Sequence, residues 1–216
     1  MKNKTTTLLL SLSFVFMLSC SHNSLKDCDC YKDYMNQKTD QEYDSLVKVA
    51  TWRYIGTYQM TNDSSLLDSA IILLDKAIEH IPVAYGAYQC KLMVLNTQRQ
   101  YQEIMDIVDQ LLEMGYELPD LYYIKARMFD ELGEPKKADE LFEKTRNLYD
   151  GWLECFPDSM ALVVANVCFV SYADGKEEGL ETLRQELKKH PNELILQATL
   201  MQLQEEPEDS WYFRQQ

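Results

Sequence analysis

Glycine, proline and histidine are scarce in this chain, and their scarcity narrows the folds and the chemistry open to it. Its 216 residues include 7 Gly and 6 Pro, too few for a loop-rich or all-β fold. The three histidines, His22, His80 and His190, lie far apart, whereas zinc-binding histidines normally come in closely spaced pairs. Glycine-rich phosphate loops and the nucleophile motif Gly-x-Ser-x-Gly are missing too. We therefore expect no enzyme activity, no cofactor and no metal site.

Positive charge is also in short supply. The chain has 21 Lys and Arg residues against 35 Asp and Glu residues, which gives a formal net charge of -14. Such a surface repels phosphate backbones, so nucleic acid is not an expected partner. The hydrophobic content of 46% is ordinary for a globular protein, and the length fits one domain.

The first twenty residues follow an order of charge, apolar run and cysteine. Lys2 and Lys4 precede an apolar stretch, residues 8–18, which is about half of the ~20 residues needed to span a bilayer. Cys20 follows directly after Leu18 and Ser19. This order resembles the bacterial lipobox, in which the signal peptide is cut before a cysteine whose thiol carries lipid. A plain secretory signal followed by a chance cysteine is the alternative.

The resemblance implies a lipid-anchored protein of the cell envelope. It makes residues 1–19 a lipoprotein signal peptide and Cys20 the lipidation site. Two or three acyl chains would hold the protein stably at a membrane. Ser21, where Asp would direct retention in the inner membrane, suits the outer membrane. The face of that membrane, periplasmic or outer, stays open.

Residues 20–38 are polar and show no sustained period, so we expect a flexible tether. Cys28 and Cys30 lie within it. One residue apart, they supply only half a metal site. They could form disulfides with a partner or with another cysteine of the chain in an oxidising compartment. The sequence context favours buried thiols for the remaining cysteines, Cys90, Cys155 and Cys168.

Apolar and small residues recur every 34 positions between residues 51 and 152. Four columns repeat over three units, and four columns in one register are strong evidence for a repeat. The columns are Tyr54, Tyr88 and Tyr122; Ala70, Ile104 and Ala138; Leu74, Val108 and Phe142; and Ala77, Leu111 and Thr145. A fourth unit follows after seven extra residues, which we place between Leu148 and Asp158. It carries Val163, Val167, Val170, Gly179 and Leu183 in the expected columns.

Capping and breaking residues predict the helix ends. Thr39 with Glu42, and Ser65 with Asp68, have the spacing of capping boxes, and Asp158, Ser159 and Asn192 are candidate caps of the later helices. First-turn prolines are expected at Pro119 and Pro135. Helices are expected to stop at Gly115, Gly133 and Gly175.

This pattern resembles the tetratricopeptide repeat (TPR) family, most clearly in residues 119–152. The resemblance implies an all-α fold: a TPR-like helical-hairpin solenoid of about four repeats with a C-terminal capping helix, in residues 39–205. Residues 206–216 form an acidic and aromatic tail. Its Trp211, Tyr212 and Phe213 either fold back onto the last helix or present a partner-binding peptide.

In this family the first helix of each hairpin lines a concave groove. The resemblance therefore implies a protein partner held in that groove, and makes the chain a membrane-anchored scaffold. The implied partner-binding residues are Trp52, Gln59, Gln89, Met93, Asn96, Tyr123, Arg127 and Asp130. The chaperone-tail clamp of some members is missing, because Ile55, Gln59, Gln89 and Met93 stand in its place. An envelope module that binds a small ligand such as a glycan, with Trp52 and Tyr123 as stacking faces, is the alternative function.

Overall fold

The computed structural model describes residues 37–207 and Arg214. Within these residues the regular structure is helical and no strand occurs, so the all-α prediction is confirmed for them. They fall into two compact units that divide the chain between Tyr116 and Glu117, and each unit is considered separately. The expected signal peptide, Cys20 and most of the tether lie outside the described residues.

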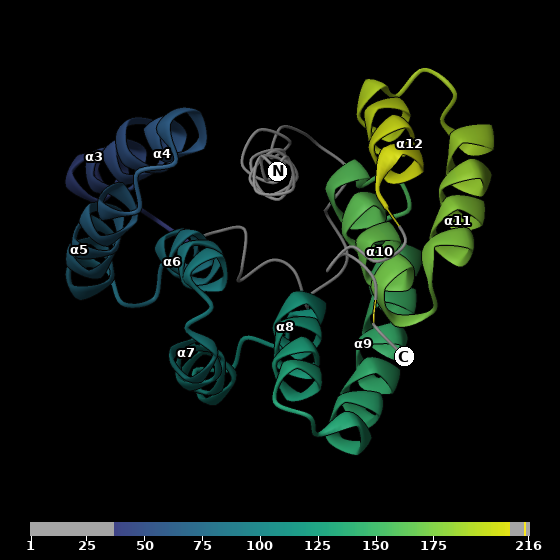
Figure 1. Ribbon diagram of the computed structural model, residues 1–216, viewed down its shortest axis with the longest axis horizontal. Helices are drawn as coiled ribbons and strands as arrows, with labels where there is room; N and C mark the ends of the chain where they lie inside the picture. Colours follow the sequence, from purple (N-terminus) through teal and green to yellow (C-terminus); the bar gives the residue numbers. More distant parts are fainter. Residues whose placement is uncertain (1–36, 208–213, 215–216) are drawn as a thin grey trace. The chain divides into compact units, whose positions relative to one another are not determined.

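The first helical run in the described part of unit 1 is uninterrupted and changes type along its length. The run comprises α3 (Gln41–Lys48), the π-helix η1 (Val49–Ile55) and α4 (Gly56–Thr61). Next come α5 (Ser65–His80), α6 (Tyr85–Gln98) and α7 (Tyr101–Glu113). The run packs on α5, α5 on α6, and α6 on α7 (Figure 1). Each helix thus buries its apolar side against its neighbours in sequence.

Two side chains, Tyr43 and Lys91, help to tie the helices of unit 1 together. The Tyr43 hydroxyl of α3 donates to the carbonyl of Ala84 at 3.1 Å and accepts from the backbone N–H of Ala87 at 2.7 Å. The ammonium of Lys91, on α6, bridges Asp75 of α5 at 2.8 Å and Glu103 of α7 at 2.9 Å. These partners raise the pKa of Lys91 against the opposing effect of its burial.

The caps of several helices differ from those expected. Asp40, rather than Thr39, caps α3, because its carboxylate accepts from the backbone N–H of Tyr43 at 2.9 Å. At the start of α5, the carboxylate of Asp63, rather than the side chain of Ser65, accepts a hydrogen bond from the backbone: the Ser65 N–H donates to it at 3.1 Å. A shift of one or two residues is enough, since Asp and Thr are both good N-caps and local backbone geometry selects between them.

The Asp40 cap also pairs with His80, whose Nε2 lies 2.8 Å from Oδ2. The contact raises the pKa of His80 above its ordinary 6.5 and lowers that of Asp40 below 3.8, where the Tyr43 N–H contributes most. The histidine's contribution to stability is therefore fully present below pH 6.5 and is lost as the pH rises through the folded pKa. That of Asp40 is present above pH 3.8 and is lost on acidification.

Replacing Asp40 with Asn should return the pKa of His80 toward 6.5, because the amide caps the helix but carries no charge. NMR titration of the His80 ring measures this pKa. Asp63→Asn, at the start of α5, is the control and should leave the pKa of His80 unchanged. An unchanged His80 pKa would show that Asp40 does not set it.

Unit 2 contains five helices in its described part. They are α8 (Pro119–Glu131), α9 (Pro135–Cys155), α10 (Met160–Ala173), α11 (Lys176–Lys189) and α12 (Leu194–Glu205). In Figure 1, α8 pairs with α9, and α10 lies beside α9, α11 and α12. Pro119 and Pro135 occupy first turns as expected. The cap expected from Asn192 is wrong: α12 begins after Glu193, and no side chain makes a capping hydrogen bond there.

The extra residues between Leu148 and Asp158 lengthen α9. This helix has 21 residues, against 13 in α7. The added turns bury Tyr149 and Trp152. The sequence interruption is thus taken up as about two further helical turns, at 3.6 residues per turn, with an apolar side of their own.

The columns of the 34-residue period are buried. Ala70, Ile104, Ala138, Leu74, Val108, Ala77, Leu111 and Thr145 have no exposed surface, and Phe142 is 5% exposed. Tyr88 and Tyr122 are buried as well, while Tyr54 is half-buried against the core of unit 1. The helix starts show the same spacing: Tyr85 to Pro119 and Tyr101 to Pro135 are each 34 residues apart (119 − 85 and 135 − 101).

Left-handed residues end several helices. Gly115, Gly133 and Gly175 all have positive φ, as expected of helix-terminating glycines. Arg99 takes the same conformation at the end of α6, with φ 58°. It lies 34 residues before Gly133 (133 − 99). Arg99 thus adopts a positive φ although, unlike glycine, it has a Cβ that disfavours this conformation.

Replacing Arg99 with Gly should stabilise the protein by about 0.5–1 kcal/mol, because a left-handed side chain costs more than glycine's added unfolded-state entropy. Urea unfolding followed by circular dichroism measures this change. Lys76→Gly, at an exposed mid-helix site of α5, should lower stability by about 1 kcal/mol. A lower midpoint for Arg99→Gly would contradict the strain argument.

Candidate partner-binding surface

The first two expected partner-binding residues lie on the opening helical run of unit 1. Trp52 is on η1 and is 60% exposed, and Gln59 is half-buried on α4. Within η1 the buried Thr51 hydroxyl donates to the Val47 carbonyl at 2.6 Å, a bond that takes up a backbone acceptor of the preceding turn. Short π-helical segments are frequent at functional sites. Ile55, also on η1, is buried in the core and cannot face a partner.

Helix α6 carries a half-buried line of residues beside a buried apolar side. Tyr85, Ala87, Tyr88, Cys90, Leu92, Val94 and Leu95 are all buried. Gln89, Met93 and Asn96 are half-buried, and their i, i+4, i+7 spacing places them along one side of the helix. Met93 also packs against the core of unit 1. We call Gln89, Met93 and Asn96 the α6 stripe.

The residues of α8 in the same register have partners within unit 2. Tyr123, Arg127 and Asp130 lie 34 positions after Gln89, Met93 and Asn96, and we call them the α8 stripe. The centre of the Tyr123 ring lies 5.7 Å from that of Phe169 and 5.9 Å from that of Tyr172, and both ring pairs are edge-to-face.

The charged members of the α8 stripe are engaged as well. The Arg127 guanidinium lies 4.6 Å from the centre of the Tyr172 ring, and Asp130 accepts from Arg214. Burial raises the pKa of Tyr123, so its phenol stays neutral. All six residues of the two stripes are half-buried, but those of the α8 stripe are contacted by Phe169, Tyr172 and Arg214 of their own unit.

Three residues that the sequence did not single out join the α8 stripe in one cluster. Tyr172 contributes the ring beneath Arg127, and Asp139 and Arg214 form an ion pair at 2.6 Å. Arg214 is the one basic residue between positions 206 and 216, a signal that could have indicated an internal acidic partner. Nothing in the sequence marks Tyr172, because it belongs to an almost uniformly apolar helix.

A further hydrogen bond of unit 2 joins Tyr149 of α9 to Asp120 of α8. The Tyr149 hydroxyl donates to Asp120 at 2.5 Å. Burial raises the pKa of Asp120, and the hydrogen bond from Tyr149 opposes that effect. Since the bond joins α8 to the lengthened α9, it holds the two helices in register.

The expectation of buried thiols holds for two of the three cysteines in the described helices. Cys90 and Cys168 are free thiols, and burial raises their pKa values to about 11 and about 12. They are therefore protonated at neutral pH and unreactive. The expectation of a buried thiol at Cys155 is wrong: this residue ends α9 at an exposed position and is disulfide-bonded. Cys28 and Cys30 lie outside the described residues.

Comparison of the chain with protein-family models, curated proteins and solved structures finds no match. Among residues 37–207, no helix is both long enough and apolar enough to cross a bilayer. The same residues contain no cluster of three or more His, Cys, Asp or Glu side chains suited to a metal ion. The site is thus characterised by its own geometry alone.

Proposed function

We propose that this chain is a membrane-anchored scaffold of the bacterial cell envelope that holds a partner protein on a TPR-like surface. The observation that carries the proposal is the α6 stripe, a line of amide and thioether side chains left half-buried beside seven buried residues of the same helix. Amides can hydrogen-bond an extended main chain, and methionine adapts its shape to varied side chains.

The repeat period supports a TPR-like arrangement within each unit. Fully buried small residues such as Ala70 and Ala138 permit close helix approach, and larger ones such as Leu74 fill the space between helices. A hairpin array of this kind stacks each repeat on its neighbours and presents an extended surface along its first helices. The α6 and α8 stripes belong to such first helices.

The anchor is proposed from the leader alone. Lys2, Lys4, the apolar run and Cys20 stand in the order of a lipoprotein signal. Cys20→Ala should abolish incorporation of an alkyne-bearing fatty acid and release the protein from the membrane fraction. Retention of the label in this variant would remove the lipidation site from the proposal.

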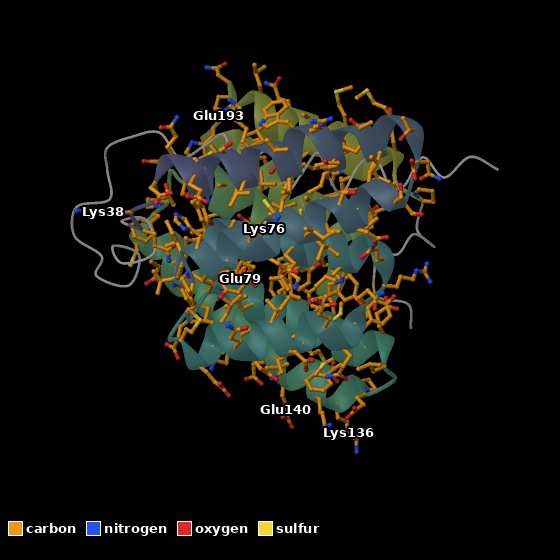
Figure 2. The ribbon with its side chains drawn as sticks, turned by 90° about the vertical axis from the view of Figure 1, so that its left-hand side faces the viewer. Lys38, Lys76, Glu79, Lys136, Glu140 and Glu193 are labelled. Carbon is orange, nitrogen blue, oxygen red and sulfur yellow. The ribbon has the colours of Figure 1, made fainter. Side chains whose placement is uncertain are left out.

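A photocrosslinking amino acid at Gln89 or Asn96, in the full chain in cells, tests the binding surface. We expect it to capture a specific protein. The same amino acid at Lys76 or Glu79 is the matched control, because Figure 2 shows these side chains on α5 of the same unit, where both are exposed. Equal capture from both pairs of positions would contradict a role for the α6 stripe.

A glycan-binding module is the second candidate, favoured by the 60% exposure of Trp52. Tyr123 does not supply a second open stacking face, because its ring packs on Phe169 and Tyr172. Binding of envelope glycans that is lost on Trp52→Ala, without capture of any protein, would favour this function over the scaffold.

A further inference from the structure

Arg214 is held in a site built for a guanidinium group. Its Nε lies 2.7 Å from Asp130 Oδ2 and its Nη2 lies 2.8 Å from Asp130 Oδ1, a two-pronged contact with one carboxylate. Its Nη1 donates to Asp139 at 2.6 Å. The guanidinium also lies 5.0 Å from the centre of the Phe142 ring. Two carboxylates and an aromatic ring thus surround one cation.

The site also holds the main chain of the residue that bears this cation. The backbone N–H of Arg214 donates to the Tyr172 carbonyl at 3.2 Å. Asp130 is the inner carboxylate, with its side chain 12% exposed, whereas that of Asp139 is 62% exposed. A bidentate carboxylate fits the planar fork of arginine, and the compact ammonium of lysine cannot reproduce it. The site therefore selects arginine, presented from a peptide backbone.

Arg214 lies on the α8 stripe, which the repeat register makes equivalent to the α6 stripe. Asp130 is a member of the α8 stripe, and it stands 34 residues after Asn96 of the half-buried α6 stripe. Tyr172, whose carbonyl accepts from the Arg214 backbone, also places its ring beneath the guanidinium of Arg127 in the α8 stripe. An intramolecular residue on a partner surface competes with the partner at an effective concentration in the millimolar range.

We propose that Arg214 is an internal substitute for the partner, and that the partner segment which displaces it presents an arginine to Asp130, Asp139 and Phe142. Arg214 is then released when the partner binds, so this arginine of the chain itself lowers the affinity of the surface for the partner. The inference rests on the proposed scaffold function and adds to it both a chemical class of partner and an autoinhibitory contact.

A fluorescent peptide with the sequence of residues 211–216, WYFRQQ, tests the site in trans. The full chain carrying Arg214→Ala should bind it about tenfold more tightly than the unaltered chain, for an intrinsic Kd near 0.1 mM against ~1 mM effective concentration. Fluorescence anisotropy measures both affinities. A peptide with lysine in place of its arginine should bind more weakly to the Arg214→Ala chain.

Two further variants locate the binding. Asp130→Asn, added to Arg214→Ala, should abolish binding of the arginine peptide while leaving the helical circular dichroism unchanged. Arg184→Ala, at a partly exposed arginine of α11, should bind the peptide as the unaltered chain does. Equal affinity of the unaltered and Arg214→Ala chains would overturn the inference, as would binding that ignores Asp130→Asn. Loss of a dimer on Arg214→Ala would overturn it too, because Arg214 would then serve a second copy.

The same variants separate this inference from the proposed function. Peptide binding as expected, together with no protein captured at Gln89 or Asn96, would leave the arginine site standing and remove the scaffold. Capture of a protein whose yield is the same with and without Arg214→Ala would support the scaffold and overturn the autoinhibitory contact.

Discussion

Replacing Ala138 with Asp should destabilise unit 2 by about 4 kcal/mol or more, because a carboxylate would be buried without a partner. Ala138 has no exposed surface, and it lies on α9 where that helix packs on α8. With no exposed surface, the site gives a carboxylate no access to solvent. Either the carboxylate is protonated at a large energetic cost, or the helix pair opens to admit solvent.

Thermal unfolding and hydrogen exchange of peptides from α8 and α9 measure this effect. Ala198→Asp is the matched control: the same substitution at an exposed position of α12 should cost no more than about 0.7 kcal/mol, the helix-propensity difference. If Ala138→Asp left the thermal midpoint of the protein in place, the close packing of the repeat columns would be refuted.

Replacing Gly179 with Ala should destabilise unit 2 by about 2 kcal/mol, although the same change stabilises most helices. A Cβ at Gly179 of α11 would lie 1.9 Å from the Ser171 Oγ and 2.9 Å from the Ser171 Cα of α10. The hydroxyl could rotate away, but the backbone atom cannot move without separating the two helices.

Gly151→Ala is the control for this substitution, because a Cβ at that position in α9 meets nothing within 4 Å. It should stabilise the protein by about 0.5–1 kcal/mol through helix propensity alone. Urea unfolding curves of the two variants should therefore shift in opposite directions. Shifts of the same sign would show that α10 and α11 adjust to the added methyl group.

Close helix contact at Gly179 was visible in the sequence only as a small residue in a repeat column. The period required something small there, and the structure shows that even alanine is too large. Arg99 illustrates the reverse case, since the repeat leads one to expect Gly and the chain nevertheless adopts positive φ. The helix-ending hydrogen bond from the Gln100 N–H to the Leu95 carbonyl accompanies that conformation.

The repeat period, the helix-stopping glycines and the first-turn prolines could all be read from the chain, because they depend on contacts within a turn or between neighbouring helices. Position-by-position burial follows from the same regularity. The caps at Asp40 and Asp63 could not be assigned so closely, since several neighbouring side chains can each accept a hydrogen bond from the first turn.

For the candidate site, too, local features could be predicted from the sequence and long-range contacts could not. The sequence alone determined that Gln89, Met93 and Asn96, and likewise Tyr123, Arg127 and Asp130, share helix faces, because 3.6 residues per turn fix that spacing. Only tertiary structure decided that Tyr172 and Arg214 cover part of the α8 stripe. Such cover comes from segments 42 and 84 residues away from Asp130, and local periodicity carries no information about contacts at that range.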